Sequence, residues 1–304
     1  MIEAFETSLR GWSLRSPDAP AILAPGRAPL LWADLCAAID AIERDLRHVV
    51  VRRTGVMAVL MPVVPETALI ALALMRFGTV VPLNPAMTAA ELSATLARLG
   101  VDVLVADPRL ACAPLDVAQG AHVPVIVADW DASASIGAVK FTWQDAPLAE
   151  KAVALAVPPE CRLILQTSGT TALPKLVPLT GENLVAAAKA VIAAHDLGPS
   201  DRALALLAQF HIGGLWDLIA APLMSGGSVI IAGAYSRAAY AAGSQLHPTW
   251  VQLAPAMMDD LLSDAKTTHA PGLRMVRSVS AALPATTRRR AQEGFGVPIV
   301  EIYG

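Results

Sequence analysis

The sequence predicts an α/β fold of doubly wound, mostly parallel sheets with helices on both faces. Helical periodicity and short β-rich runs alternate through most of the 304 residues, which is typical of parallel sheets. The composition, 55% hydrophobic and 16% charged, allows a core larger than one compact lobe needs. The alternation weakens between about Pro108 and Pro159. We therefore expect two lobes or two domains, residues 1–157 and 158–304, between whose sheets segments can be exchanged.

The first series of elements is regular up to residue 106. It comprises a helix over 32–49, a strand over 56–60, a helix over 66–77, a strand over 79–83 that Asn84-Pro85 ends, a helix from Thr88 to Leu99 and a strand over 102–106. Thr88 and Glu91 have the spacing of a capping box. Beyond Pro108 only the strand 123–127 is clear, and 129–140 resembles a loop.

A second series begins near residue 162. It comprises strands over 162–166, 203–207, 228–231, 249–253, 275–280 and 298–302, with helices over 181–194 and 213–223 and two helices opened by Pro255 and Pro284. The chain stops at Tyr303-Gly304, directly after an apolar strand. Open α/β sheets bind ligands at the carboxyl ends of their strands, so a functional loop is expected there and the chain looks truncated.

Composition excludes several functional classes. A net charge of −3, with Arg288 to Arg290 as the one basic cluster, gives no electrostatic footprint for nucleic acid, and these arginines are predicted to form a solvated helix face. The three cysteines, Cys36, Cys112 and Cys161, lack C-x-x-C spacing, which predicts free core thiols and neither a disulfide framework nor a zinc site.

Neither the longest uncharged stretch nor the N-terminus has the pattern of a membrane or targeting signal. The uncharged stretch 218–236 is interrupted by Pro222 and a Ser-Gly-Gly-Ser turn, so it reads as a buried helix, turn and strand, with no membrane span. The N-terminus lacks the basic-then-apolar pattern of a signal peptide. We therefore expect a cytoplasmic protein.

A loop rich in hydroxyl groups follows the strand that ends at Gln166. It contains Thr167, Ser168, Gly169, Thr170 and Thr171, with Lys175 a few residues on. Backbone N–H groups and hydroxyls at the carboxyl end of a strand can replace the hydration of a polyphosphate, and a lysine compensates its charge. The loop does not fit G-x-x-x-x-G-K-[ST], because Pro174 precedes the lysine. The alternative is an ordinary turn between two strands with a surface lysine.

The stretch from Thr167 to Thr171 with Pro174 and Lys175 resembles the phosphate-binding signature of the adenylate-forming enzymes, which include acyl- and aryl-CoA synthetases, peptide-synthetase adenylation domains and firefly luciferase. Ala172 and Leu176 depart from it, since the family usually has glycine at both positions, and we expect a stiffer loop and slower turnover. Three further stretches are similar to family segments in family order: 65–85, 209–215, and 278–284 with 295–304. The resemblance covers essentially the whole chain.

The resemblance implies the N-terminal domain of the adenylate-forming fold, without the later barrel and C-terminal domain. It implies ATP-dependent activation of a carboxylic acid to an acyl-adenylate, then transfer to a thiol, most simply that of CoA. Lys175 and His211 would serve catalysis, and the 167–171 loop would bind the ATP phosphates. The other implied contacts are an adenine and AMP site at Ser280, Ala281, Ala282, Glu301, Ile302, Tyr303 and Gly304, and an acyl pocket at Phe210, His211, Gly213 and Gly214.

The resemblance also implies that part of the active site lies outside this chain, and it leaves alternatives open. The family's glutamate ligand for Mg²⁺ lies beyond residue 304, so no metal ligand is predicted in this chain, and the isolated chain is expected to be inactive. A carrier-protein thiol is the alternative acceptor to CoA. A degenerate, non-catalytic nucleotide- or ligand-binding module is the alternative from another class. His211 on an apolar stretch could also be a hydrogen-bonded core residue.

Overall fold

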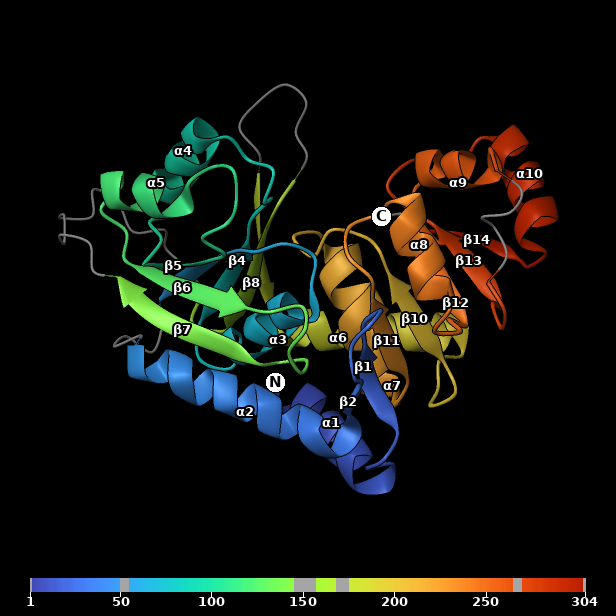
Figure 1. Ribbon diagram of the computed structural model, residues 1–304, viewed down its shortest axis with the longest axis horizontal. Coiled ribbons are helices and arrows are strands. Elements are labelled where there is room, and N and C mark those ends of the chain that lie inside the picture. Colours follow the sequence, from blue (N-terminus) through green and yellow to red (C-terminus); the bar gives the residue numbers. More distant parts are fainter. Residues whose placement is uncertain (1, 50–54, 145–156, 168–174, 265–269, 303–304) are drawn as a thin grey trace.

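The computed structural model describes residues 2–49, 55–144, 157–167, 175–264 and 270–302, and it contains two seven-stranded sheets (Figure 1). Sheet A has the strand order β14 (Ile299–Glu301), β13 (Met275–Ser278), β12 (Trp250–Leu253), β10 (Arg202–Ala205), β11 (Ser228–Ile231), β1 (Pro20–Leu23) and β2 (Leu30–Leu31). Sheet B has the order β7 (Val139–Gln144), β6 (Val125–Trp130), β5 (Val103–Ala106), β3 (Val56–Leu60), β4 (Thr79–Pro82), β8 (Cys161–Gln166) and β9 (Leu176–Thr180).

Most strand pairs are parallel, and the antiparallel pairs are the hairpins at the sheet edges. These are β1 with β2, β6 with β7, and β8 with β9. Each sheet borrows a hairpin from the other half of the chain: β1–β2 joins sheet A through β11, and β8–β9 joins sheet B through β4. The predicted α/β class with mostly parallel sheets is confirmed.

Helices cover both faces of each sheet. Between the sheets lie α1 (Ile2–Arg15), α2 (Trp32–Val49), α3 (Pro65–Leu74), α6 (Gly181–His195), the π-helix η1 (Gly213–Ala220) and α7 (Ala221–Ser225). The outer face of sheet B packs against α4 (Ala89–Leu99) and α5 (Pro114–Gly120). The outer face of sheet A packs against α8 (Arg237–Ser244), α9 (Pro255–Leu262) and α10 (Ala285–Phe295). Strands with two covered faces explain the apolar runs in the sequence.

Local signals account for several element ends. The capping box at α4 forms as predicted: the Thr88 hydroxyl accepts from Glu91 N at 3.3 Å, and Glu91 Oε2 accepts from Thr88 N at 2.8 Å. Thr180 and Asn183 make the same arrangement at α6. The three cysteines are free and buried, which confirms that prediction.

Other expectations need correction. The segment 129–140 is not one loop, because β6 continues to Trp130 and β7 begins at Val139. The helix expected over 213–223 is a π-helix followed by the α-helix α7. The helix expected to reach Phe77 ends at Leu74, and α1, β1, β2, α5, β7, α8 and β9 were not predicted from the sequence. These are short, partly exposed or edge elements, where periodicity is weak.

A buried ion pair connects the β1–β2 hairpin of sheet A to the half of the molecule that contains sheet B. Arg27, in the β1–β2 turn, donates to both carboxylate oxygens of Glu66 at the start of α3, at 3.1 and 2.7 Å. Arg27 also donates to the carbonyls of Ala134 and Ser135, in the turn between β6 and β7. Glu66 is fully buried, so these bonds are its compensation for lost hydration. They attach the hairpin of sheet A to sheet B.

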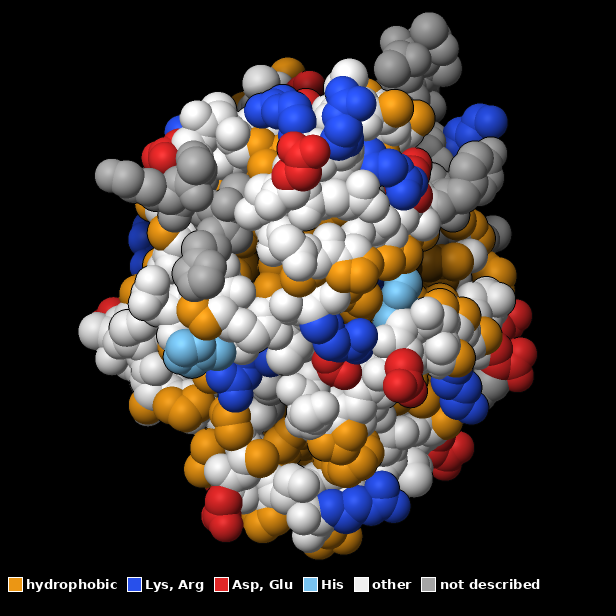
Figure 2. Space-filling model, turned by 90° about the vertical axis from the view of Figure 1, so that its right-hand side faces the viewer, with side chains coloured by type: hydrophobic (Ala, Val, Ile, Leu, Met, Phe, Trp, Pro, Cys, Tyr) orange, Lys and Arg blue, Asp and Glu red, His pale blue; other side chains and the backbone are white. Residues whose placement is uncertain are grey.

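The surface over α8, α9 and α10 carries basic and acidic side chains mixed together (Figure 2). Arg288 pairs with Glu301, and Arg290 Nη1 lies 2.9 Å from Asp259 Oδ1.

No helix within the described ranges has both the length and the apolar character that crossing a membrane requires.

Candidate functional site

The neck of the hydroxyl-rich loop is a β-hairpin at the carboxyl end of β8. Gln166 pairs with Leu176, and beyond them Thr167 N donates to Lys175 O at 3.0 Å while Lys175 N donates to Thr167 Oγ1 at 3.1 Å. Thr167 and Lys175 are exposed. The loop therefore starts at the predicted edge of a parallel strand. Ser168, Gly169, Thr170 and Thr171 lie outside the described residues.

The segment expected at the adenine follows β13. Ser280, Ala281 and Ala282 are exposed, and Ser280 has φ 72°, a left-handed conformation that is uncommon for residues other than glycine. Such backbone conformations concentrate at functional sites. At the next strand, Ile302 N donates to Ser278 O at 3.1 Å, which places Ile302 beside the same loop.

The remaining residues of that expected site divide into two groups. The Glu301 carboxylate pairs with Arg288 of α10, so it is engaged on the outer side of sheet A. Tyr303 and Gly304 lie outside the described residues.

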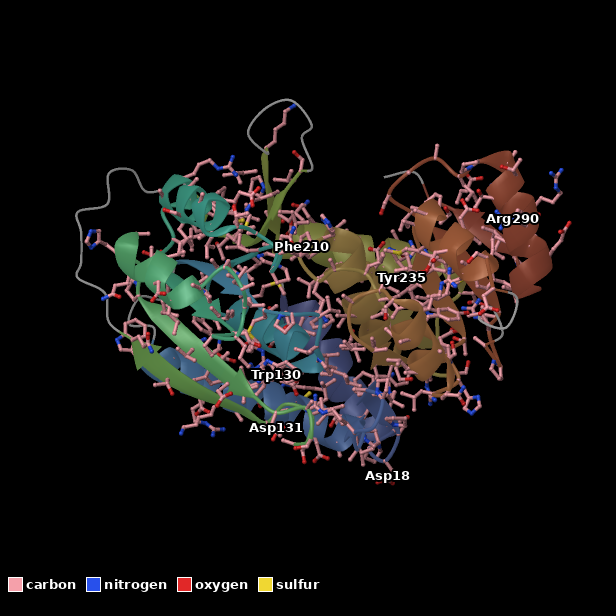
Figure 3. All side chains as sticks on the ribbon, turned by 45° about the horizontal axis from the view of Figure 1, so that its top comes forward. Asp18, Trp130, Asp131, Phe210, Tyr235 and Arg290 are labelled. Carbon is pink, nitrogen blue, oxygen red and sulfur yellow. The ribbon has the colours of Figure 1, made fainter. Side chains whose placement is uncertain are left out.

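The segment expected to line the acyl pocket connects β10 to η1. The rings of Phe210 and His211 have centroids 4.3 Å apart, and His211 is exposed (Figure 3 labels Phe210). Partial desolvation lowers the pKa of His211, which favours the neutral imidazole. A neutral imidazole can accept a proton at one ring nitrogen and donate a hydrogen bond from the other.

Close packing explains the two glycines that follow. A Cβ at Gly214 would overlap the Ala208 carbonyl, and one at Gly213 would lie 2.6 Å from Gln252 Nε2. The glycines therefore let η1 approach both the preceding loop and the β12 strand.

The carboxyl edges of the two sheets meet at this segment. Gln209, after β10 of sheet A, donates through Nε2 to Val64 O at 3.3 Å, and Val64 precedes α3 at the carboxyl end of β3 in sheet B. Thr167 follows β8, which pairs with β4, the neighbour of β3. The loops after β10, β13 and β14 share one edge of sheet A, because these strands are parallel and connected through β12. Apart from the Glu301 side chain, the described parts of the predicted site thus lie on the side where the two edges meet.

One polar cluster in this region was missed from the sequence. Arg277 is 2% exposed on β13, its Nη2 lies 3.4 Å from Asp217 Oδ2 of η1, and its guanidinium carbon lies 5.5 Å from the Trp250 ring centroid. Burial lowers the pKa of Arg277 and raises that of Asp217, so the contact does not compensate fully for their lost hydration. A charged residue within a predicted strand was the sequence feature that could have indicated it, and the strand Met275–Ser278 is buried throughout.

No group of three or more His, Cys, Asp or Glu side chains in the described part of the chain is arranged to hold a metal ion. Lys175 and Thr167 are the described residues whose chemistry suits a phosphate chain, because an ammonium and a hydroxyl are ordinary phosphate partners.

Comparison with known proteins identifies the family and shows similarity to CoA ligases. The family model described as "AMP-binding enzyme" matches residues 9–304. A sulfoacetate–CoA ligase from Cupriavidus necator is 33% identical over 99% of this chain and 60% of its own length. An oxalate–CoA ligase from Arabidopsis thaliana is 28% identical over 94% of this chain and 57% of its own length. The chain therefore spans about 60% of the curated relatives it matches.

Solved structures share the fold. ATP-bound MatB from Rhodopseudomonas palustris superimposes with a TM-score of 0.78 at 22% identity, covering 98% of this chain and 59% of MatB. The N-terminal domain of FACL13 from Mycobacterium tuberculosis superimposes with a TM-score of 0.80 at 19% identity, covering 99% of this chain and 75% of that one. At these identities the likeness establishes the fold alone.

Proposed function

The chain belongs to the AMP-binding enzyme family, and from that premise we propose that it binds ATP and a carboxylic acid as part of an acid–CoA ligase. The names of the CoA ligases to which it is similar support this reaction class. The activity is proposed for the whole protein, whatever its full length, and the cytoplasm, where ATP and CoA are available, is proposed as its location.

In the proposed reaction an oxygen of the carboxylate attacks the α-phosphorus of ATP. The bond to the bridging oxygen breaks, pyrophosphate leaves and an acyl-adenylate forms. The CoA thiolate then attacks the acyl carbon, and AMP leaves with the bonding electron pair. A Mg²⁺ ion bound with ATP would supply further positive charge at the phosphates, beside Lys175. Catalysis of such steps depends mainly on positioning and on compensating charge.

The observation that carries the proposal is the hairpin neck at the carboxyl end of β8. It holds an exposed hydroxyl and an exposed ammonium at the two ends of one loop, on the side where the carboxyl edges of the sheets meet. We propose that the 167–171 loop and Lys175 bind the phosphates, and that Ser280 to Ala282 with Ile302 to Gly304 border the adenosine. Phe210, His211, Gly213 and Gly214 would then border the acid.

Replacing Lys175 with methionine should weaken ATP binding by about 10-fold or more, because the variant loses a cation beside the phosphates while its side chain stays similar in size. Isothermal titration with Mg-ATP measures the change. Lys189→Met is the matched control, because Lys189 is an exposed lysine of α6 and its loss removes the same charge. Equal affinity in K175M and K189M would contradict the phosphate role of Lys175.

The ligase reaction itself is tested by pyrophosphate release from ATP, with hydroxylamine to trap the acyl-adenylate, over a panel of small carboxylic acids. The relatives named for sulfoacetate and oxalate put those two acids first in the panel. Transfer is then tested with CoA and with a phosphopantetheinylated carrier protein in parallel. The absence of ATP binding and of acid-dependent pyrophosphate release would favour a non-catalytic binding module.

A further inference from the structure

A buried guanidinium group in sheet A lacks partners for two of its nitrogen atoms. The side chain of Arg277 is 3% exposed, and neither its Nε nor its Nη1 has a hydrogen-bond partner among the described residues. A buried cationic donor without a partner destabilises the folded protein far more than an exposed one does. Such a group is retained in a buried strand most simply when a ligand supplies the missing acceptors.

The protein's own acceptor for Arg277 is weak. Asp217 makes a single contact to Nη2, at 3.4 Å, which is longer than the 2.7–2.9 Å usual for a charge-assisted hydrogen bond. The Trp250 ring packs beside the guanidinium but accepts no conventional hydrogen bond. His195, which lies near Arg277, adds no negative charge. The Nε and Nη1 atoms are therefore available for an anion.

The register of sheet A shows where this group lies. Arg277 is opposite Gln252 on the neighbouring parallel strand, so both side chains project from the same face. Gln252 lies against Gly213, and Asp217 belongs to η1, so that face is the one covered by η1. Gln252 Oε1 is also buried without a partner. The unpaired polar atoms therefore lie beneath the Phe210–Gly214 segment, where the acid is proposed to bind.

Strand geometry limits the size of the acid. Ser280, at the expected adenylate, follows Arg277 by three residues, which span at most about 10 Å because β13 ends at Ser278 and Ser280 is left-handed. An acid whose reacting carboxylate lies near that end has room for only a few carbon atoms before it reaches Arg277.

We infer that Arg277 binds a second acid group of the substrate, so that the acid activated is a short one with a carboxylate or sulfonate at its far end. Planar guanidinium groups bind such anions through two parallel hydrogen bonds from one edge, which pairs Nη2 with either Nε or Nη1. An anion would therefore use one of the two unpartnered nitrogens together with Nη2, in place of the long Asp217 contact. This inference rests on the proposed function, because it assigns the substrate class of the same site.

The first test measures binding to the chain itself, by thermal shift and by isothermal titration in the presence of Mg-ATP. The acids are matched in length: acetate, propionate and butyrate against oxalate, malonate, succinate and sulfoacetate. The dianionic acids should raise the melting temperature while the monoacids leave it unchanged. Comparing malonate with sulfoacetate separates carboxylate from sulfonate recognition. Preference for the monoacids would overturn the inference.

The second test changes the guanidinium. Arg277→Gln should weaken binding of the preferred dianionic acid on the order of 100-fold, as is common for loss of a buried charge partner. Arg277→Lys should recover part of this affinity. Asp217→Asn should keep the preference or strengthen it, because it removes the competing carboxylate and leaves Arg277 in place.

A matched control is Arg202→Gln. Arg202 is partly buried on β10 of the same sheet, but it donates to Ser228 Oγ at 3.1 Å and to Leu246 O at 2.6 Å. Its loss should lower stability without changing the preference for dianionic acids. If R277Q does not fold, the acid panel on the unsubstituted chain and on D217N still decides the inference.

Failure of the inference is distinguishable from failure of the proposed function. Pyrophosphate release by the whole protein with monoacids, unchanged in kcat/KM by R277Q, would overturn the role of Arg277 and leave the ligase reaction standing. If neither monoacids nor dianionic acids support pyrophosphate release, and K175M and K189M bind ATP equally well, both the ligase reaction and the role of Arg277 would be overturned.

Discussion

At the scale of single residues, desolvation and two nearby guanidinium groups lower the pKa of a histidine. His195, at the end of α6, is desolvated and lies near Arg277 and Arg274, and its pKa falls from 6.5 to about 4. A histidine at the end of a helix is ordinarily favoured in its charged form. Here desolvation, together with the repulsion from two guanidinium groups, outweighs that effect, so the imidazole is neutral at pH 7.

The pH dependence of stability follows from this shift. The folded protein binds the His195 proton less tightly than the unfolded chain does. The stability of the folded state is therefore unaffected by His195 above pH 6.5, and it falls as the pH is lowered towards 4. His195→Gln should therefore lose less stability than the unsubstituted chain between pH 7 and pH 4. Urea denaturation at several pH values measures this difference, and parallel pH profiles for the two proteins would contradict the assignment.

Residue chemistry also set the limits of sequence-based prediction. Thr88 and Glu91 were predictable as a cap, because capping is a local effect of four residues. Lys175 was predictable as an exposed cation at a loop, because Pro174 and the hydroxyls lie within the same few residues. Arg277 was not, because its lack of partners depends on Gln252 and η1, which the sheet register brings together from distant parts of the chain.

At the scale of elements, η1 is the feature that shapes the candidate acid site. A π-helix is rare and is often found at functional sites. Here its first turn donates two backbone hydrogen bonds to the carbonyl of His211, from Gly214 N at 3.1 Å and from Leu215 N at 3.0 Å. The sequence predicted a helix over this range, but hydropathy does not distinguish a π-helix from an α-helix.

Gly214→Ala should lower the free energy of unfolding by about 1 to 3 kcal/mol, because the added methyl group overlaps the Ala208 carbonyl and the loop has to move. Chemical denaturation measures the loss. Gly11→Ala in α1 is the control: its Cβ would meet nothing within 4 Å, and alanine favours a helix, so this variant should be as stable as the original or more so. Equal stability of both variants would show that η1 tolerates a side chain at residue 214.

At the scale of the whole molecule, the exchange of hairpins makes each sheet depend on both halves of the chain. The division into lobes 1–157 and 158–304 remains a prediction, and the topology adds that β1–β2 belongs to sheet A and β8–β9 to sheet B. The alternating pattern predicted strands and helices, but no local signal showed which sheet a strand joins. Pairing between distant strands is decided by tertiary packing.

Cooperative unfolding should follow from this exchange. Ile22, on β1, is fully buried in sheet A, so Ile22→Ala should cost about 3 kcal/mol. Cys112 and Cys161 belong to the core of sheet B, so their labelling by a thiol reagent reports unfolding there. Under mild denaturant these two cysteines should be labelled faster in I22A than in the unsubstituted chain. The increase should match the loss in free energy of unfolding. Unchanged rates would show that sheet A opens by itself.

The pairing of Ile22 with Val229 also has a consequence for biosynthesis. The two residues are about 200 positions apart, so at a translation rate of roughly 5 to 20 residues per second the nascent N-terminal hairpin waits about 10 to 40 seconds for its partner strand. Throughout that interval its apolar face is exposed on the ribosome, and trigger-factor-type chaperones should bind it there. Arrest of translation before residue 229, followed by crosslinking at β1, measures that contact.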